Sequence, residues 1–273
     1  KEEEENSSNF AKHISNLGDI FVNDAFSCSH RNHSSICQIP KFIPSYSGLQ
    51  LNSEVHALKK LTSNIQKPIT CIMGGSKIST KINIIKNLIP KFDNIIIVGG
   101  MGNNILKYKG FQIGKSIIEK NCSELVEEIF NLSKEKNCKI FFPEDVLVGK
   151  NINDSSKIKL LDDVSFNEMI LDIGPNTIKT IKNTINASKT VLWNGPAGYF
   201  ENSNFSKGSY EIGKEIAKKT KEQKIYSVVG GGDTIKLINQ INLFNNYNFV
   251  STAGGAFLEY LEGKNLPGIK ALN

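Results

Sequence analysis

The chain contains the stretch Ile69-Thr70-Cys71-Ile72-Met73-Gly74-Gly75, a short apolar run that ends in two glycines. A run of this kind, with a helical stretch after it, is typical of a buried parallel strand. The pattern recurs at residues 95–100, 190–195, 226–232 and 249–255. In an open parallel sheet, ligands bind at the carboxyl ends of the strands, and glycines there let backbone amides approach a phosphate. The repeats therefore predict a sheet that binds a nucleotide-sized anion.

The rest of the chain alternates between strand and helix patterns. Strands are expected at 95–98, 139–142, 169–173, 190–193, 225–229 and 248–251, and helices at 77–89, 101–108, 121–136, 176–186, 207–219 and 233–240. This alternation favours an α/β fold, in which helices cover both faces of a parallel sheet. We expect one complete domain over residues 66–260, the remainder of another over 1–44, a connecting helix within 45–65 and a tail over 261–273.

The composition of the chain argues against several classes of protein. The net charge of +6 comes from lysines spread along the chain, and no basic stripe with interleaved aromatics indicates nucleic-acid binding. No apolar run approaches the roughly 18 residues of a membrane span. The five cysteines form no C-x-x-C pair, which favours reduced thiols in a cytoplasmic protein over a zinc site or a disulfide framework. The chain opens on Lys1-Glu2-Glu3-Glu4-Glu5, with no initiating Met, and we expect it to be truncated.

The first motif with chemical content is Gly74-Gly75-Ser76-Lys77, followed by Lys81. A helix that starts near Ser76 would place Lys77 and Lys81 on one side of its first turns. Lysines at the positive end of a helix are unfavourable unless an anion binds there. The alternative is two surface lysines in a lysine-rich chain. The Walker A pattern G-x-x-x-x-G-K-[ST] is absent from this stretch.

The second motif is Gly230-Gly231-Gly232-Asp233-Thr234. Successive glycines leave amides free to form a phosphate nest at a helix start, and the Asp233 carboxylate could hold Mg²⁺. The simpler interpretation is that Asp233 or Thr234 is an N-cap, but capping does not need three glycines before it. We therefore favour a phosphate site. The dinucleotide fingerprint G-x-G-x-x-G is absent here.

Two weaker candidates lie elsewhere. Asn194, at a strand end, could donate an amide hydrogen bond to a phosphate, and Glu201 could accept from ribose hydroxyls. Taken alone, this segment is better explained as a turn with a surface glutamate. Arg31 suits bidentate recognition of a carboxylate or phosphate, whereas the neighbouring His30 and His33 are more typical of a solvated loop.

Taken together and in order, these motifs resemble the phosphoglycerate kinase family. The resemblance covers essentially the whole chain, and although each motif is weak, the ordered set is very specific. It is carried by Asn23-Asp24-Ala25-Phe26 with His30-Arg31, Gly74-Gly75-Ser76-Lys77 with Lys81, Gly99-Gly100-Met101, Leu171-Asp172-Ile173-Gly174-Pro175, Trp193-Asn194-Gly195-Pro196, Gly230-Gly231-Gly232-Asp233, Gly254-Gly255-Ala256, Leu261-Glu262-Gly263-Lys264 and Leu266-Pro267-Gly268.

The resemblance implies reversible phosphoryl transfer between 1,3-bisphosphoglycerate and ADP in glycolysis, by a cytoplasmic monomer. It also implies a Rossmann-like nucleotide domain at 66–260, with residues 1–44 as the remainder of an α/β substrate domain. Mg²⁺ would be the cofactor and ATP or ADP a substrate. The implied site residues are Lys77 and Gly232 for catalysis, Arg31 for 3-phosphoglycerate, Asp233 for Mg²⁺, and Lys81, Gly99, Gly100, Asn194, Glu201, Gly231, Gly232, Asp233 and Thr234 for the nucleotide.

Two departures from the family pattern are visible. Ala253 stands where the family usually has the first of three glycines, and its methyl group would restrict or crowd that loop. The family's chain is also longer at its N-terminus, where most basic substrate contacts lie. We therefore expect this chain to bind nucleotide and to turn over poorly or not at all. The alternatives are a nucleotide-binding fragment or degenerate paralogue, and an NAD-dependent dehydrogenase, which the missing fingerprint disfavours.

Overall fold

The computed structural model describes residues 1–272, which fall into two compact units. One unit comprises residues 65–250, and the other comprises 1–64 together with the C-terminal segment from residue 251 onward. This grouping differs from the expected domain boundaries, because the segment after residue 250 packs with the N-terminal part. For example, the Gly268 amide donates to the Ser29 carbonyl oxygen at 2.8 Å.

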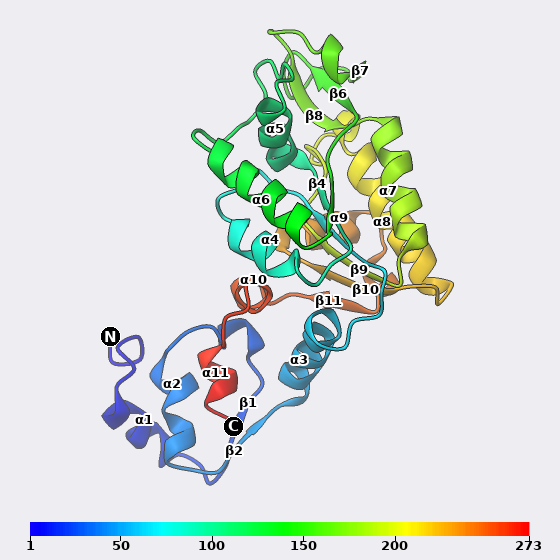
Figure 1. The fold of residues 1–273 in the computed structure, drawn as a ribbon. Coiled ribbons are helices and arrows are strands. Elements are labelled where there is room, and N and C mark those ends of the chain that lie inside the picture. The colour runs from blue at the N-terminus through cyan, green and yellow to red at the C-terminus, as the bar shows by residue number, and fades with distance from the viewer. Residues whose placement is uncertain (273) are drawn as a thin grey trace. The chain divides into compact units, whose positions relative to one another are not determined.

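The larger unit is built on a six-stranded sheet, which confirms the predicted α/β class (Figure 1). The strands lie in the order β11-β10-β9-β3-β4-β5, and the pairings from β10 through β5 are parallel. They are β3 (Ile69–Met73), β4 (Asn94–Ile97), β5 (Lys139–Phe141), β9 (Thr190–Asn194), β10 (Tyr226–Gly230) and β11 (Phe249–Ser251). The chain runs outward from β3 to β5 and returns to β9 on the other side of β3. This order is that of a doubly wound dinucleotide-type sheet, and its direction reverses between β3 and β9.

Helices cover both faces of this sheet. In Figure 1, α4, α5 and α6 gather on one face, and α7 and α8 lie on the other. The helices of this unit are α4 (Ile82–Leu88), α5 (Gly99–Tyr108), α6 (Ser123–Glu135), α7 (Pro175–Ala187), α8 (Lys207–Lys221) and α9 (Gly232–Gln240). Short 3-10 turns are η3 (Leu161–Asp163), η4 (Ser203–Phe205) and η5 (Phe244–Asn246).

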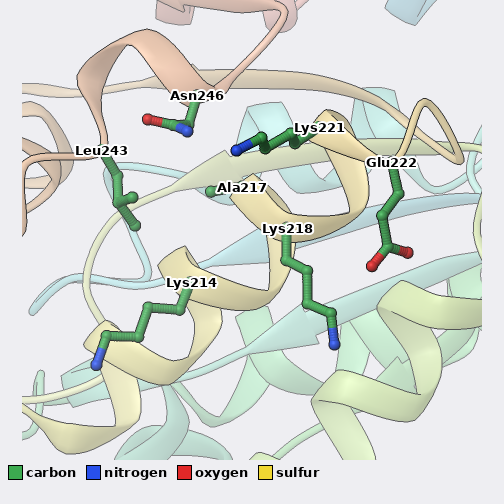
Figure 2. Close-up of a pocket in the computed structure, with 7 residues that line it drawn as sticks. All are labelled: Lys214, Ala217, Lys218, Lys221, Glu222, Leu243 and Asn246. Carbon is green, nitrogen blue, oxygen red and sulfur yellow. The ribbon is translucent and has the colours of Figure 1, made fainter.

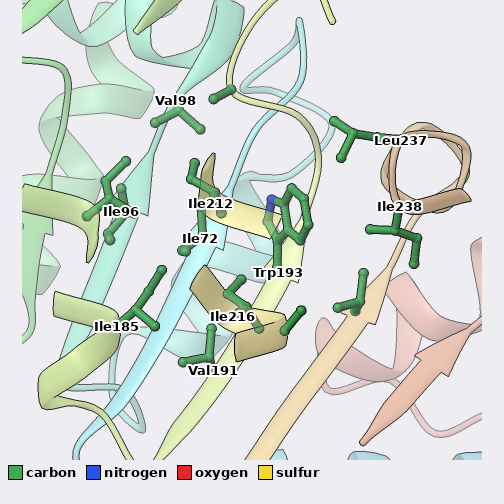
Figure 3. Packing of buried hydrophobic residues seen from close by; sticks show 14 of the residues in the cluster. Ile72, Ile96, Val98, Ile185, Val191, Trp193, Ile212, Ile216, Leu237 and Ile238 are labelled. Carbon is green, nitrogen blue, oxygen red and sulfur yellow. The ribbon is translucent and has the colours of Figure 1, made fainter. Parts of the chain in front are cut away.

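The main core forms where α7 and α8 pack on the sheet. Apolar residues recur at helical spacing, for instance Ile212 and Ile216 on α8, and both are fully buried. Figure 3 shows them beside Trp193 of β9, whose indole is also fully buried. The Trp193 Nε1 donates to the Gly195 carbonyl oxygen at 2.9 Å, so the core extends directly beneath the glycine turn that follows β9.

A second, smaller sheet in the same unit has the order β7-β6-β8 and is antiparallel. Its strands are β6 (Asp145–Gly149), β7 (Lys157–Leu160) and β8 (Met169–Ile173). The expected strand at 169–173 exists, but it pairs with β6 in this sheet, so its placement in the parallel series was wrong. The strands β6 and β7 were not predicted.

The other unit contains the N-terminal elements and the C-terminal helices. Its elements are α1 (Ser8–Ser15), β1 (Phe21–Asn23), η1 (Phe26–Cys28), α2 (Ser34–Cys37), η2 (Ile39–Lys41), β2 (Ser45–Ser47), α3 (Leu49–Thr62), α10 (Gly255–Leu261) and α11 (Pro267–Lys270). The α3 helix falls within the predicted 45–65 segment, and the Asp24 Oδ1 accepts from the Leu51 amide at its start, at 2.9 Å. Across the described residues, every helix is too short or too polar to cross a membrane.

Candidate functional site

The candidate site lies at the carboxyl ends of β3 and β9, where the direction of the sheet reverses. The turns after these strands touch, because the Gly74 amide donates to the Asn194 carbonyl oxygen at 2.9 Å. A Cβ at Gly195 would lie 2.3 Å from the Gly74 carbonyl oxygen, and the φ of Gly195 is +104°. Only glycine satisfies both conditions without strain. The two turns therefore form one continuous backbone surface at the switch point.

Lys81 joins these two turns. Its Nζ donates to the Gly74 carbonyl oxygen at 2.7 Å and to the Asn194 Oδ1 at 2.6 Å, with a longer contact of 3.3 Å to the Asn194 carbonyl oxygen. Burial lowers the pKa of the Lys81 ammonium to about 8, although the charges of Cys71 and Asp233 act in the opposite direction. The structure thus holds a desolvated amine at the centre of the predicted anion site.

The loop that carries Lys81 is not helical from Ser76, and that prediction was wrong. Helix α4 begins at Ile82, and Lys81 occupies its N-cap position. The backbone before it is fixed by a φ of +121° at Gly75 and by the Ser79 amide, which donates to Glu119 at 3.0 Å. As a result, Lys77 is exposed on a loop, while Lys81 is turned inward.

The third strand end, after β10, leads into helix α9. Gly231 precedes the helix with a φ of +97°, and a Cβ there would lie 2.8 Å from the Asn194 Nδ2. That same amide nitrogen donates to the Gly230 carbonyl oxygen at 2.8 Å. The hydroxyl of buried Thr234 accepts from the Gly195 amide at 2.7 Å. The Asn194 side chain therefore ties β9 to β10, and the Thr234 side chain ties the turn after β9 to the start of α9. Asp233 lies at the exposed start of α9.

A cleft of about 250 Å³ opens beside these strand ends. Of the predicted site residues, Gly99, Gly100, Glu201 and Asp233 line it. Its opposite wall was missed by sequence reasoning, because it comes from the small antiparallel sheet and neighbouring loops. That wall is formed by Ile117, Pro143, Ile152 and the β8 residues Met169, Ile170, Leu171 and Asp172. The cleft thus has an apolar wall facing a glycine-rich, polar edge, as small-molecule sites commonly do.

Asp172 is the one buried carboxylate of this wall. Its Oδ2 accepts from the Gly208 amide at 2.7 Å, and its Oδ1 accepts from the Ile173 amide at 2.9 Å. Burial raises the pKa of Asp172 to about 7, and these two hydrogen bonds lower it only in part. The motif Leu171-Asp172-Ile173-Gly174-Pro175 was visible in the sequence, but nothing in its composition indicated that it faces a cleft.

The remaining predicted residue, Arg31, belongs to the other unit and is exposed there. Nearby, the His30 Nδ1 is buried without a hydrogen-bond partner among the described residues. His33 lies 3.8 Å from Glu3, a distance suited to an ion pair when the imidazole is protonated.

A separate groove of about 430 Å³ lies along α8 (Figure 2). Lys214, Ala217, Lys218 and Lys221 of α8 line it together with Leu243. None of the predicted site residues lines this groove. This groove is larger than the cleft, but it is not the candidate site, because it lies away from the carboxyl ends of the parallel strands.

One residue at the cleft, Asp233, is suited to hold Mg²⁺. Over residues 1–272, no three His, Cys, Asp or Glu side chains are grouped so that they could hold a metal. Mg²⁺ in nucleotide sites is usually held by one or two carboxylates together with substrate phosphates. The exposed carboxylate of Asp233, at the cleft and next to the amides that begin α9, matches this donor set.

The chain is similar to known proteins in both sequence and fold. The family model described as phosphoglycerate kinase matches residues 1–264. A phosphoglycerate kinase of Wolbachia sp. subsp. Brugia malayi is 45% identical over 274 aligned positions, which cover 100% of this chain and 69% of that protein. The solved structure of phosphoglycerate kinase from Coxiella burnetii superposes with a TM-score of 0.95 at 41% identity, covering 100% of this chain and 70% of that one. The crystal structure of the Pyrococcus horikoshii enzyme matches with a TM-score of 0.81 at 25% identity, over 97% of this chain and 68% of that one.

Proposed function

This chain belongs to the phosphoglycerate kinase family, and from that premise we propose that it acts in reversible phosphoryl transfer between 1,3-bisphosphoglycerate and ADP. The products are 3-phosphoglycerate and ATP. The unit of residues 65–250 supplies the nucleotide-binding domain. The unit of residues 1–64 and the segment from residue 251 onward contains Arg31 and supplies part of the substrate domain. The protein acts as a monomer in the cytoplasm and binds neither nucleic acid nor membrane.

The observation that carries this proposal is the position of Lys81. A buried amine sits between the turns after β3 and β9, at the switch point where doubly wound sheets bind nucleotides. Beside it, the first amides of α9 are free to donate hydrogen bonds to phosphate oxygens, since a helix start leaves its first amides without intrahelical partners. Together they provide a positive centre for a polyphosphate.

The other residues take roles that follow from their places. Gly99 and Gly100 line the cleft opposite Leu171, and their lack of side chains leaves room for a flat purine base. Glu201, at the cleft edge, accepts from the ribose hydroxyls. Asn194 orients Lys81 and faces the phosphates. Gly231, Gly232 and Thr234 shape the phosphate loop.

Phosphoryl transfer requires positioning and charge stabilisation more than covalent participation by the protein. Mg²⁺, held by Asp233, would neutralise charge on the nucleotide phosphates. Lys77, on the exposed loop before α4, stabilises the charge of the transferring group together with the Gly232 amide. Arg31 binds 3-phosphoglycerate. The nucleophile is a phosphate or carboxylate oxygen that is already ionised, so no general base is needed.

A paired assay tests this function. The first measurement is a calorimetric titration of MgADP into the chain, and the second is ATP formation from 1,3-bisphosphoglycerate and ADP in a coupled assay. Saturable binding with turnover supports the proposed reaction and contradicts the expectation that this chain turns over poorly. Binding without turnover supports the alternative, a chain that only binds nucleotide. The two cases need to be distinguished because the chain covers 69% of the Wolbachia relative. Absence of binding by the folded chain contradicts both.

A further inference from the structure

Asp172 stands at the junction of three elements of the larger unit. It lies in β8, and only 2% of the residue is exposed. Through the Gly208 amide it holds the first turn of α8, which begins at Lys207. Because the positive end of a helix favours a negative charge, this contact is stronger than a neutral hydrogen bond of the same length.

The third element is the loop 196–201, which carries Glu201 and lines the cleft. The Tyr199 amide donates to the Leu171 carbonyl oxygen at 2.7 Å, and the Ala197 amide donates to the Ser209 Oγ at 2.8 Å. Between these two contacts, Gly198 packs directly on the Asp172 carboxylate, since a Cβ there would lie 2.5 Å from its Oδ1. The backbone of the loop is therefore shaped against Asp172.

A buried carboxylate without a cation beside it lowers folding stability. An apolar side chain in the same place would not carry this cost. Among the described residues, no ion pair involves Asp172. Departures from the most stable choice are expected at functional sites rather than at purely structural ones. This carboxylate lies in the cleft wall and packs against a loop that also lines the cleft, which makes it a candidate of that kind.

We propose that Asp172 is a positioning residue for the nucleoside end of the cleft: by fixing loop 196–201 against α8, it places Glu201 for the ribose. This inference rests on the proposed nucleotide function and deepens it. The phosphate end of the site is held by different residues, Lys81 and the start of α9, so the two ends respond separately to substitution.

The variant Asp172→Asn tests this assignment. An amide offers one acceptor oxygen, and its NH₂ group must face one of the two backbone N–H donors that the carboxylate now serves. The matched control is Asp145→Asn on the neighbouring strand β6. Asp145 is 1% exposed and accepts from the Asn176 and Thr177 amides at the start of α7, at 2.9 and 2.8 Å, but it does not line the cleft.

The measurement is calorimetric titration of each variant with MgADP and with magnesium pyrophosphate, which lacks the nucleoside. We expect Asp172→Asn to weaken MgADP about tenfold, the effect of one lost buried hydrogen bond, and to leave pyrophosphate affinity unchanged. Asp145→Asn should lower the thermal midpoint without changing the ratio of the two affinities. Equal loss of both ligands in Asp172→Asn, or no loss of either, overturns the inference.

Two other results of these titrations are also decisive. If wild-type protein binds neither ligand, the proposed function itself fails, and the inference fails with it. If Asp172→Asn does not fold, Ser209→Ala takes its place, because it removes the hydroxyl that accepts from Ala197 and loosens the same loop. Selective loss of MgADP binding in Ser209→Ala supports the positioning role of the loop anchor, and an unchanged affinity ratio overturns it.

Discussion

Replacing Lys81 by methionine is expected to weaken MgADP binding at least about thirtyfold, because it removes a charge-assisted contact to phosphate from a desolvated site. The Lys81 Nζ is held by the Gly74 carbonyl oxygen and the Asn194 Oδ1, at 2.7 and 2.6 Å, so the charge is already in place before the ligand arrives. Methionine keeps the length and the apolar contacts of the side chain. The effect should therefore appear in affinity far more than in folding stability, and isothermal calorimetry measures it.

The matched control is Lys182→Met, which removes the same charge from the same unit. Lys182 pairs with Glu211 between α7 and α8, whereas the hydrogen bonds of Lys81 go to the turns after β3 and β9. We expect its MgADP affinity to stay within about twofold of wild type, because Lys182 is paired with a half-buried carboxylate and a charge separated from the ligand by more than about 10 Å is largely screened. Equal affinities of Lys81→Met and wild type would remove Lys81 from the phosphate site.

The lowered pKa of Lys81 gives this variant a second signature. With a pKa of about 8, part of the Lys81 population in the free protein is neutral at pH 8. A bound polyphosphate favours the ammonium form, so binding should take up protons, and affinity should fall as the pH rises above about 8. The free energy of unfolding depends on pH in the direction opposite to that expected for a paired lysine. Burial of the Lys81 ammonium lowers folding stability below pH 8, and this cost is relieved as the pH rises toward the usual lysine pKa. Titrations at pH 8 in two buffers of different ionisation enthalpy report the uptake, which Lys81→Met should abolish.

Replacing Gly195 by alanine is expected to cost about 4 kcal/mol of folding stability or more, which places it among the most damaging single substitutions. The methyl group would meet the Gly74 carbonyl oxygen at 2.3 Å, and the φ of +104° is strained for any residue with a Cβ. The three atoms nearest to this methyl group are all backbone atoms of Gly74, so relief requires the turns after β3 and β9 to move apart. Chemical denaturation, followed by the fluorescence of the buried Trp193, measures the loss.

Gly232→Ala is the comparison for this substitution. A Cβ at Gly232 meets no atom within 4 Å, and its φ is not positive. We expect its unfolding free energy to stay within about 0.5 kcal/mol of wild type, as for most unconstrained surface positions. Similar denaturation midpoints for Gly195→Ala and Gly232→Ala would show that the contact between the two turns is not a constraint on the fold.

The parallel sheet could be predicted from the sequence because its central strands carry an unusually clear signal. These strands are short, contain β-branched residues, are almost fully buried, and each ends in a glycine turn. They are β3 (Ile69–Met73), β9 (Thr190–Asn194) and β10 (Tyr226–Gly230). The small sheet lacked that signal. Strand β7 reads Lys157-Ile158-Lys159-Leu160 and is mostly exposed, and β6 is stabilised by antiparallel neighbours whose pairing no local pattern reveals.

The sequence indicated which residues to consider for the site, but it did not indicate their geometry. The isoleucines after Gly75 have helical spacing, but a tertiary hydrogen bond from Ser79 to Glu119 and the φ of Gly75 keep that stretch in a loop. The link from Lys81 to Asn194 spans 113 residues, and it becomes visible only once β3 and β9 are neighbours. Likewise, the apolar wall at Leu171 reaches the cleft through the small sheet, which explains why sequence reasoning missed it.

The most direct test of the central claim is a crystal structure of this chain soaked with MgADP. We predict that the phosphates lie within hydrogen-bond distance of the first α9 amides and near the Lys81 Nζ, with Mg²⁺ on Asp233 and the base between Gly100 and Leu171. Density for the nucleotide elsewhere, such as in the lysine-lined groove of α8, with the turns after β3, β9 and β10 unchanged and empty, would contradict it.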